Sequence, residues 1–346
     1  MSCCFFNMCA DFCNDDEDLA TEYGFDVLSI VAQRLLLSSR IEKIPHELEK
    51  GKVLSITSSA LLNCQRWAIN LMCGESSEAD IAFHFNPRIL QRCVVRNSRI
   101  KGQWGNEETL LNGHFGINHG EAFHLKIFTA DDQFFVTYNE RFICSFRFRV
   151  SPHTITHVEL SGSLGLDEII VEDFHKFPMG DEDLYVVEEI DGAVLNDTQM
   201  KTPFRSVLPA GLQLNWQLEV HGIPRMLPQT FSVGLREGIY LWPSTNITLQ
   251  LTAYFGNNML VRNAFIDNKW GHEERTKGNK FLPATPFSLW IRRGPKRYSI
   301  WVNGKLQAEF TYKSDPDQVK SVYIQGDVDI RGIYVNKNPE KYFLGT

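Results

Sequence analysis

The sequence predicts an all-β protein that consists of two antiparallel β-sandwiches in tandem. Short runs alternate apolar and polar residues, for example 53–57, 67–71, 81–85 and 134–138. This is the pattern of antiparallel strands with one buried face. A set of residues also recurs 166 positions later, which indicates a duplicated domain. Finally, 346 residues are enough for two domains with a core each.

Residues 1–40 form a leader of different composition. It holds four of the eight cysteines and an acidic run at 15–18, and residues 18–40 are compatible with one amphipathic helix. The start has no basic segment and no small-residue cleavage site, so we expect no secretory signal and synthesis in the cytosol. We expect reduced thiols, with metal binding or acylation as the alternatives. The leader cysteines are Cys3, Cys4, Cys9 and Cys13.

The alternating pattern then divides the chain into two units. We expect a first domain at 41–176, an acidic linker at 177–201, a second domain at 202–338 and a tail at 339–346. In the second domain Asn303 and Gly304 separate two alternating runs, which is the strongest local hairpin signal; residues 139–140 are the matching turn of the first domain. Each repeat is domain-sized, so two packed antiparallel sheets per copy is the expected architecture.

A set of polar and aromatic residues marks a candidate site in the first copy. Side chains at i, i+2 and i+4 of a strand point to the same face, so His84, Asn86 and Arg88 should line one surface. Phe83 and Phe85 then point into the core. The following segment completes the candidate set, which is His84, Asn86, Arg88, Asn97, Trp104 and Glu107. The result is a shallow site with one aromatic wall and several hydrogen-bonding groups.

Such a site suits a neutral pyranose. The C–H groups of galactose form an apolar face that can lie on an indole ring. Its axial 4-hydroxyl can donate to and accept from imidazole, amide and guanidinium groups together. A site built for one hydroxyl rejects sugars that lack it in that orientation, because its polar groups would remain unpaired. An ion pair between Arg88 and Glu107 would hold both side chains in place.

These residues resemble the carbohydrate signature of the galectins, the β-galactoside-binding lectins. The family pattern is His-x-Asn-x-Arg, then Val-x-Asn, then Trp-x-x-Glu-x-Arg. The matching residues are His84, Asn86, Arg88, Val95, Asn97, Trp104 and Glu107. Thr109 replaces the final Arg, which affects the subsite beyond galactose. The resemblance covers residues 44–174 well and 203–337 more weakly.

The resemblance implies a jelly-roll-like sandwich of the concanavalin type for each copy. It implies that the His, Asn and Arg of the first motif contact the 4-hydroxyl of galactose. It further implies that Trp104 stacks on the sugar, and that Asn97 and Glu107 contact the 6-hydroxyl.

The second copy departs from the signature. Aligning residues 251–258 on the first copy's strand puts Tyr254 at the His position, Gly256 at the Asn position and Asn258 at the Arg position, with a following turn four residues shorter. We therefore expect this domain to bind galactose weakly or not at all, and to have acquired another ligand, a protein partner or a scaffolding role. The residues of a possible second site are Asn263, Trp270, Glu273 and Arg275.

Other functions fit the sequence less well. A net charge of −7 gives no electrostatic reason to expect nucleic acid, and no apolar run is long enough to span a bilayer. The histidines lack metal-ligand spacing, so we expect neither metal nor cofactor. Retaining glycoside hydrolysis needs two carboxyl groups about 5–5.5 Å apart. The neighbours Glu107 and Glu108 would face opposite ways on a strand, so we expect no catalytic residues.

The sequence thus predicts a non-enzymatic, calcium-independent lectin. Its N-terminal domain would bind β-galactosides on glycans, glycoproteins or glycolipids. The alternative is a galectin-like scaffold whose main partner is a protein. Galectins lack signal peptides and leave the cell by an unconventional route, so the resemblance implies both cytoplasmic and extracellular locations.

Overall fold

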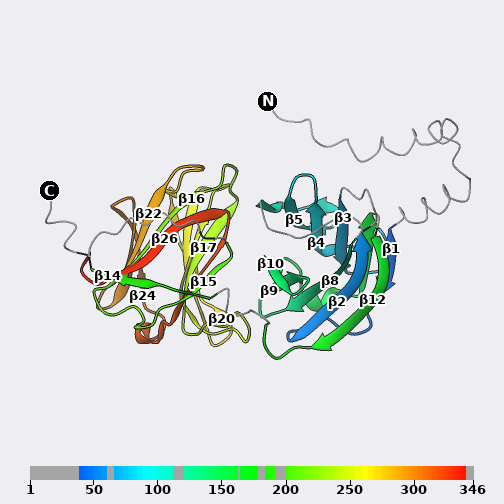
Figure 1. The fold of residues 1–346 in the computed structure, drawn as a ribbon, viewed down its shortest axis with the longest axis horizontal. Helices are drawn as coiled ribbons and strands as arrows, with labels where there is room; N and C mark the ends of the chain where they lie inside the picture. The colour runs from blue at the N-terminus through cyan, green and yellow to red at the C-terminus, as the bar shows by residue number, and fades with distance from the viewer. Residues whose placement is uncertain are drawn as a thin grey trace, which may run out of the picture.

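The computed structural model describes residues 39–60, 66–111, 121–162, 164–177, 184–191, 200 and 202–339. It contains two β-sandwiches that lie side by side, the first in blue to green and the second in green to red (Figure 1). The predicted all-β class and tandem arrangement are therefore confirmed. The four leader cysteines, and all but the last two residues of the predicted leader helix, lie outside the described residues.

The first sandwich consists of two sheets. One contains β1 (Arg40–Lys43), β3 (Trp67–Met72), β4 (Ile81–Arg88), β5 (Cys93–Ile100), β6 (Gln103–Trp104), β7 (Glu108–Leu111) and β11 (His157–Gly162). Its order is β1-β11-β3-β4-β5-β6, with β7 also paired to β5. The other contains β2 (Lys52–Ala60), β8 (Ala122–Thr129), β9 (Gln133–Tyr138), β10 (Arg141–Arg147) and β12 (Leu164–Asp173), in the order β10-β9-β8-β2-β12.

The second sandwich repeats this plan. One sheet contains β13 (Leu184–Val186), β15 (Phe204–Val207), β17 (Thr230–Arg236), β18 (Ile247–Tyr254), β19 (Met259–Ile266), β20 (Lys269–Trp270), β21 (Glu274–Lys277) and β25 (Ser321–Gly326). Its order is β13-β15-β25-β17-β18-β19-β20, with β21 paired to β19. The other contains β14 (Glu188–Ile190), β16 (Gln217–Pro224), β22 (Phe287–Arg293), β23 (Arg297–Val302), β24 (Lys305–Thr311) and β26 (Val328–Asn336), in the order β14-β26-β16-β22-β23-β24.

Alternation along β4 builds the core and the candidate site together. Phe83 and Phe85 are fully buried, and Phe83 stacks on Phe134 and Phe146 with ring centroids 5.4 and 4.9 Å apart. Burying a Phe side chain contributes roughly 1.5–3 kcal/mol, so these rings fix which face of β4 points inward. A slip of one residue would exchange the two faces. Core packing therefore holds His84 on the outer surface.

Both predicted hairpin turns are present. Asn139 and Glu140 join β9 to β10 with φ of 47° and 64°, and Asn303 and Gly304 join β23 to β24 with φ of 49° and 73°. Positive φ at both central residues is the requirement of a two-residue type I′ turn, and Asn and Gly adopt it most easily.

The acidic stretch expected to be a linker contains two short strands. β13 pairs in parallel with β15, and β14 pairs in parallel with β26. Residues 184–190 thus add one strand to an edge of each sheet of the second sandwich.

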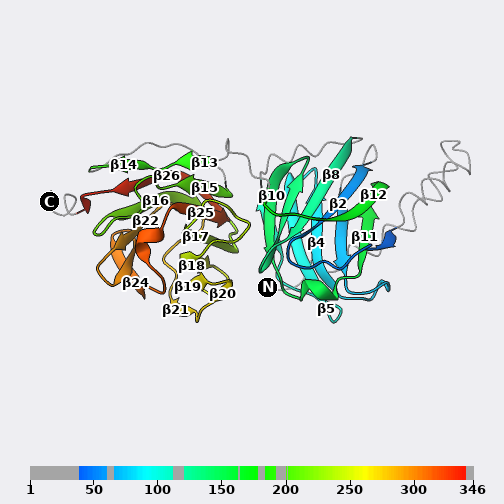
Figure 2. The same ribbon diagram turned by 90° about the horizontal axis from the view of Figure 1, so that it is seen from below.

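A third apolar cluster lies between the two sandwiches. Residues of the first sandwich, including Phe128 and Phe135, pack together with Leu241 and Trp242 of the second sandwich. Figure 2 shows the corresponding edges of the two sandwiches next to each other.

Cys73, Cys93 and Cys144 are free thiols. No helix among the described residues is long and apolar enough to cross a membrane.

Candidate binding site

Strands β4, β5 and β6, with the segment before β7, place the six candidate residues of the first domain on one surface, which we call the first face. Their register sets His84 opposite Asn97. The ring of His84 lies 4.9 Å from that of Trp104, edge-on, and Arg88 Nη2 lies 3.5 Å from Glu107 Oε2. The structure thus brings together all of the residues that the sequence assigns to this site: His84, Asn86, Arg88, Asn97, Trp104 and Glu107.

Trp104 forms an accessible wall of the first face. Its relative exposure is 46%, which is unusual for so large an apolar side chain. The two-residue strand β6 is held by pairing with β5, and the backbone N–H of Gly105 donates to the carbonyl of Ser98 at 2.9 Å. The indole is therefore both fixed in position and open to a ligand.

His84 is held as a neutral hydrogen-bond acceptor. Burial, with a smaller effect of the positive charge on Arg88, lowers its pKa from 6.5 to about 4. Nδ1 lies 2.5 Å from Oδ1 of Asn70, whose Nδ2 donates to Glu159 at 2.7 Å. Because a carboxylate only accepts, Asn70 must present its oxygen to the imidazole. His84 then carries its hydrogen on Nδ1, and Nε2, which has no partner among the described residues, can accept a hydrogen bond from a ligand.

Arg88 and Asn86 hold each other in place. Nε of Arg88 donates to Oδ1 of Asn86 at 3.1 Å, and Nδ2 of Asn86 donates to the carbonyl of Trp67 at 2.5 Å. The remaining guanidinium group pairs with Glu107, which also accepts from Thr109 at 3.3 Å. Thr109 thus contacts Glu107 at the place where the family signature has its second Arg. The guanidinium fork is oriented without a ligand.

Arg149 belongs to the site, although no sequence motif points to it. Nη1 donates to Oδ1 of Asn97 at 2.9 Å, while Nη2 donates to the carbonyl of Asn106 and to Glu108, both at 2.8 Å. Its guanidinium lies 4.7 Å from the ring centroid of Phe146. Arg149 follows β10, on the opposing sheet, so only the fold brings it to Asn97. It fixes both Asn97 and the segment that leads from Trp104 to β7.

The amide of Asn97 is oriented by three hydrogen bonds. Oδ1 accepts from the backbone N–H of Ser98 at 2.8 Å as well as from Arg149, and Nδ2 donates to the carbonyl of Gly105 at 2.9 Å. An amide nitrogen carries two hydrogens. Among the described residues, Nδ2 donates only to Gly105. Its second hydrogen is therefore available to a ligand.

The structure corrects the sequence alignment of the second copy. Asn263 pairs with Gln250, Val261 with Thr252 and Met259 with Tyr254. Since Asn263 corresponds to Asn97, the equivalents of the first-motif residues follow from this register: Gln250 for His84, Thr252 for Asn86 and Tyr254 for Arg88.

The alignment that placed Tyr254 at the His position, Gly256 at the Asn position and Asn258 at the Arg position is therefore wrong. β18 ends at Tyr254, and residues 255–258 form a turn. A turn does not present alternate side chains on one sheet face. The offset between equivalent residues of the two copies is 166 throughout, from His84 and Gln250 to Glu107 and Glu273. This constant offset identifies the correct register.

The residues retained in the second copy keep part of the first-copy geometry. Nδ2 of Asn263 donates to the carbonyl of Gly271 at 3.0 Å, as Asn97 does to Gly105. Glu273 pairs with Arg275 at 2.5 Å. We call Gln250, Thr252, Tyr254, Asn263 and Trp270 the second face. At the three first-motif positions it has neither an imidazole nor a guanidinium, and its amide there is that of Gln250 in the position of His84.

Comparison with known proteins gives consistent matches. The family model described as galactoside-binding lectin matches residues 40–171 and 203–335. The 32 kDa beta-galactoside-binding lectin of Haemonchus contortus is 25% identical over 294 residues, which cover 84% of this chain and 93% of that protein. Galectin-4 of Sus scrofa is 26% identical over 309 residues, with coverages of 84% and 93%. The solved structure of galectin LEC-6 of Caenorhabditis elegans is 23% identical, with a TM-score of 0.36, covering 40% of this chain and 93% of that chain.

Proposed function

This chain belongs to the galactoside-binding lectin family, with two copies of the family domain, and on that premise we propose that its first domain binds β-galactoside glycans. The family is one of lectins, not enzymes. We further propose that the second domain has altered or lost sugar binding. Glycoproteins and glycolipids inside or outside the cell are the corresponding partners.

One observation carries the proposal for the first domain: a neutral imidazole lies beside an exposed indole. His84 has its pKa lowered to about 4, and its ring is 4.9 Å from that of Trp104. A neutral His84 accepts from a sugar hydroxyl through Nε2 while Trp104 stacks on the apolar side of the ring. A protonated His84 would only donate.

The other residues of the first face complete the recognition of galactose. Arg88 donates to the axial 4-hydroxyl that His84 accepts from, and Asn86 contributes a second polar group. Asn97 and Glu107 then contact the 6-hydroxyl. An equatorial 4-hydroxyl would leave the oriented groups of His84 and Arg88 unpaired, which costs about 1–3 kcal/mol per buried group.

Altered binding by the second domain follows from what replaces these groups. Tyr254, in the position of Arg88, has no cationic fork, and Thr252, in the position of Asn86, has no amide. Gln250 retains hydrogen-bonding capacity but not the geometry of an imidazole. The stacking residue Trp270 remains without the groups that distinguish the axial hydroxyl.

Retention of the full-length chain on lactose-agarose tests the proposal. The unmodified chain should bind and elute with free lactose, and Trp104→Ala should pass through the column. The matched variant Trp270→Ala changes the equivalent residue of the second domain and should still bind. Retention of Trp104→Ala, or loss of binding in Trp270→Ala alone, would contradict the assignment.

A galectin-like scaffold with a protein as main partner is the alternative function. It would be favoured if the folded, unmodified chain failed to bind lactose-agarose but still captured a defined protein ligand after Trp104→Ala.

A further inference from the structure

We infer that the first domain of the same chain packs against the second face and occupies it. The chain then presents one open sugar site rather than two. The inference rests on the proposed function for the identity of the two faces. Strand β10 and the turn between β8 and β9 of the first domain lie against the second face, and the observations below describe how.

Trp270 is engaged by the first domain. Its Nε1 donates to Oδ2 of Asp132 at 2.9 Å, and the guanidinium of Arg147 lies 4.8 Å from its ring centroid. Asp132 lies in the turn between β8 and β9, and Arg147 is the last residue of β10. The indole that would stack on a sugar therefore stacks on an arginine of the neighbouring domain. Trp104, the equivalent residue of the first domain, remains 46% exposed.

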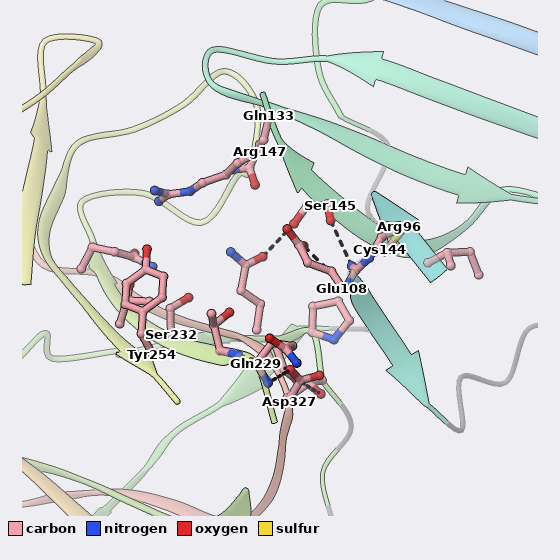
Figure 3. A pocket seen from close by; sticks show the side chains of 18 of the residues that line it. Arg96, Glu108, Gln133, Cys144, Ser145, Arg147, Gln229, Ser232, Tyr254 and Asp327 are labelled. Carbon is pink, nitrogen blue, oxygen red and sulfur yellow. Dashed lines mark hydrogen bonds and ion pairs between the residues drawn. The ribbon is translucent and has the colours of Figure 1, made fainter. Parts of the chain in front are cut away.

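Three further residues of the second face look onto the first domain across a cavity. Gln250, Thr252 and Tyr254 line a cavity whose opposite wall includes Ser145 and Arg147 of the first domain. Figure 3 shows Tyr254 across this cavity from Ser145 and Arg147. Oγ of Ser145 donates to Oε1 of Gln325 at 2.9 Å, and Gln325, on β25, also lines this cavity. The residues at the positions that bind a sugar hydroxyl in the first domain thus face the surface of the first domain.

An apolar contact beside the cavity fastens the two domains. Trp242 is 7% exposed and Phe135 only 1% exposed, and both belong to the cluster between the domains. The ring centroids of Phe174 and Trp242 are 5.4 Å apart, and the backbone N–H of Phe177 donates to the carbonyl of Trp242 at 3.3 Å. Separating the domains would expose these aromatic rings to water, which is unfavourable. The polar contacts at Trp270 are therefore supported by hydrophobic burial next to them.

The consequence concerns valence. A sugar that stacks on the indole face occupied by Arg147 must first displace that side chain. While the first domain occupies the second face, each chain holds one galactoside. A single chain then cannot bridge two glycans. Bridging would require more than one copy of the chain.

Fluorine NMR of the full-length chain with 5-fluorotryptophan tests this inference. Trp104→Phe and Trp270→Phe assign the two resonances, and lactose and a soluble gadolinium chelate are the probes. Lactose should shift the Trp104 resonance and leave that of Trp270 unchanged. The chelate should broaden the Trp104 resonance several-fold more than that of Trp270.

A double substitution, Asp132→Ala with Arg147→Ala, should shift the Trp270 resonance and raise its broadening by the chelate toward that of Trp104. The matched control is Lys126→Ala with Glu140→Ala, which removes an ion pair of 2.7 Å elsewhere on the same sheet. That control should leave the Trp270 resonance in place.

Equal broadening of Trp104 and Trp270 in the unmodified chain would overturn the inference, and this result does not depend on the double substitution of Asp132 and Arg147. A lactose-induced shift of Trp270 would overturn it as well. If Trp270 is protected but lactose does not shift Trp104, the proposed function fails while the interdomain contact stands.

Discussion

At the scale of single residues, His84 shows how burial selects the chemistry of the site. Its pKa falls from 6.5 to about 4, first because of burial and second because of Arg88. The unfolded chain takes up a proton below about pH 6.5, whereas the folded chain does so only near pH 4. Stability that is fully present above pH 6.5 is therefore lost as pH falls toward 4, by a total of about 3 kcal/mol.

The same shift predicts the pH dependence of binding. Lactose affinity that depends on neutral His84 should stay nearly constant from pH 7.5 to about 5 and fall by about half near pH 4, where half of the rings are protonated. Calorimetric titration with lactose across this range, alongside the ¹⁵N chemical shift of His84, measures both curves. A midpoint near 6.5 in either curve would show that the imidazole is not held neutral.

We expect Arg149 to affect lactose binding indirectly, through Asn97, without contacting the sugar. Arg149→Ala removes the charged donor that fixes Asn97, and a hydrogen bond from a charged group contributes about 1.5–3 kcal/mol. Lactose should therefore bind roughly ten-fold more weakly or worse, and Arg149→Lys should recover part of the loss.

The matched control is Arg141→Ala, an exposed arginine at the start of β10. Calorimetry should give it the affinity of the unmodified chain. Equal affinity for Arg149→Ala and Arg141→Ala would remove the positioning role of Arg149.

The sequence was informative about side chains that share one strand and uninformative about those that arrive from elsewhere. His84, Asn86 and Arg88 follow from the two-residue period of β4. Asn70, which orients the imidazole, lies on β3, and Arg149 follows β10. Their contacts depend on strand pairing and sheet packing, which a single sequence does not specify.

At the scale of elements, β18 shows the limit of aligning by residue type. Placing Tyr254 at the His position required a turn four residues shorter in the second copy. The observed register keeps the turns equal, because Arg88 and Tyr254 precede Asn97 and Asn263 by the same number of residues. Residue similarity was a weaker guide than conserved spacing between two paired strands.

The corrected register leads to a prediction for β18. The triple variant Gln250→His, Thr252→Asn and Tyr254→Arg restores the first-motif groups, yet the first domain still covers them. Calorimetry should give one lactose per chain, as for the unmodified protein. Adding Asp132→Ala and Arg147→Ala should raise the number of bound lactose molecules toward two.

Two sites in the triple variant alone would mean that the second face is open to solvent. One site after all five substitutions would mean that the restored groups are not sufficient for binding.

At the scale of the whole molecule, the two sandwiches are similar in plan but differ in what their corresponding faces contact. The first face carries an exposed Trp104, while Trp270 of the second face contacts Asp132 and Arg147. The alternating strands and the repeat predicted two domains, and the eroded signature predicted a divergent second one. That the first domain covers the second face could not be predicted, because it depends on how the finished domains pack.

Shallow polar sugar sites bind weakly one at a time, since a small polar ligand offers little apolar area for burial. Strong attachment to a glycan surface then requires several sites presented together. With one open site per chain, that strength would come from several chains or from several glycans on one partner.

The most direct test of the account is the stoichiometry of lactose binding to the full-length chain, measured by isothermal titration calorimetry. The account predicts one lactose per chain, with binding abolished by Trp104→Ala and retained by Trp270→Ala. Two lactose molecules per chain, or a single site that survives Trp104→Ala, would contradict it.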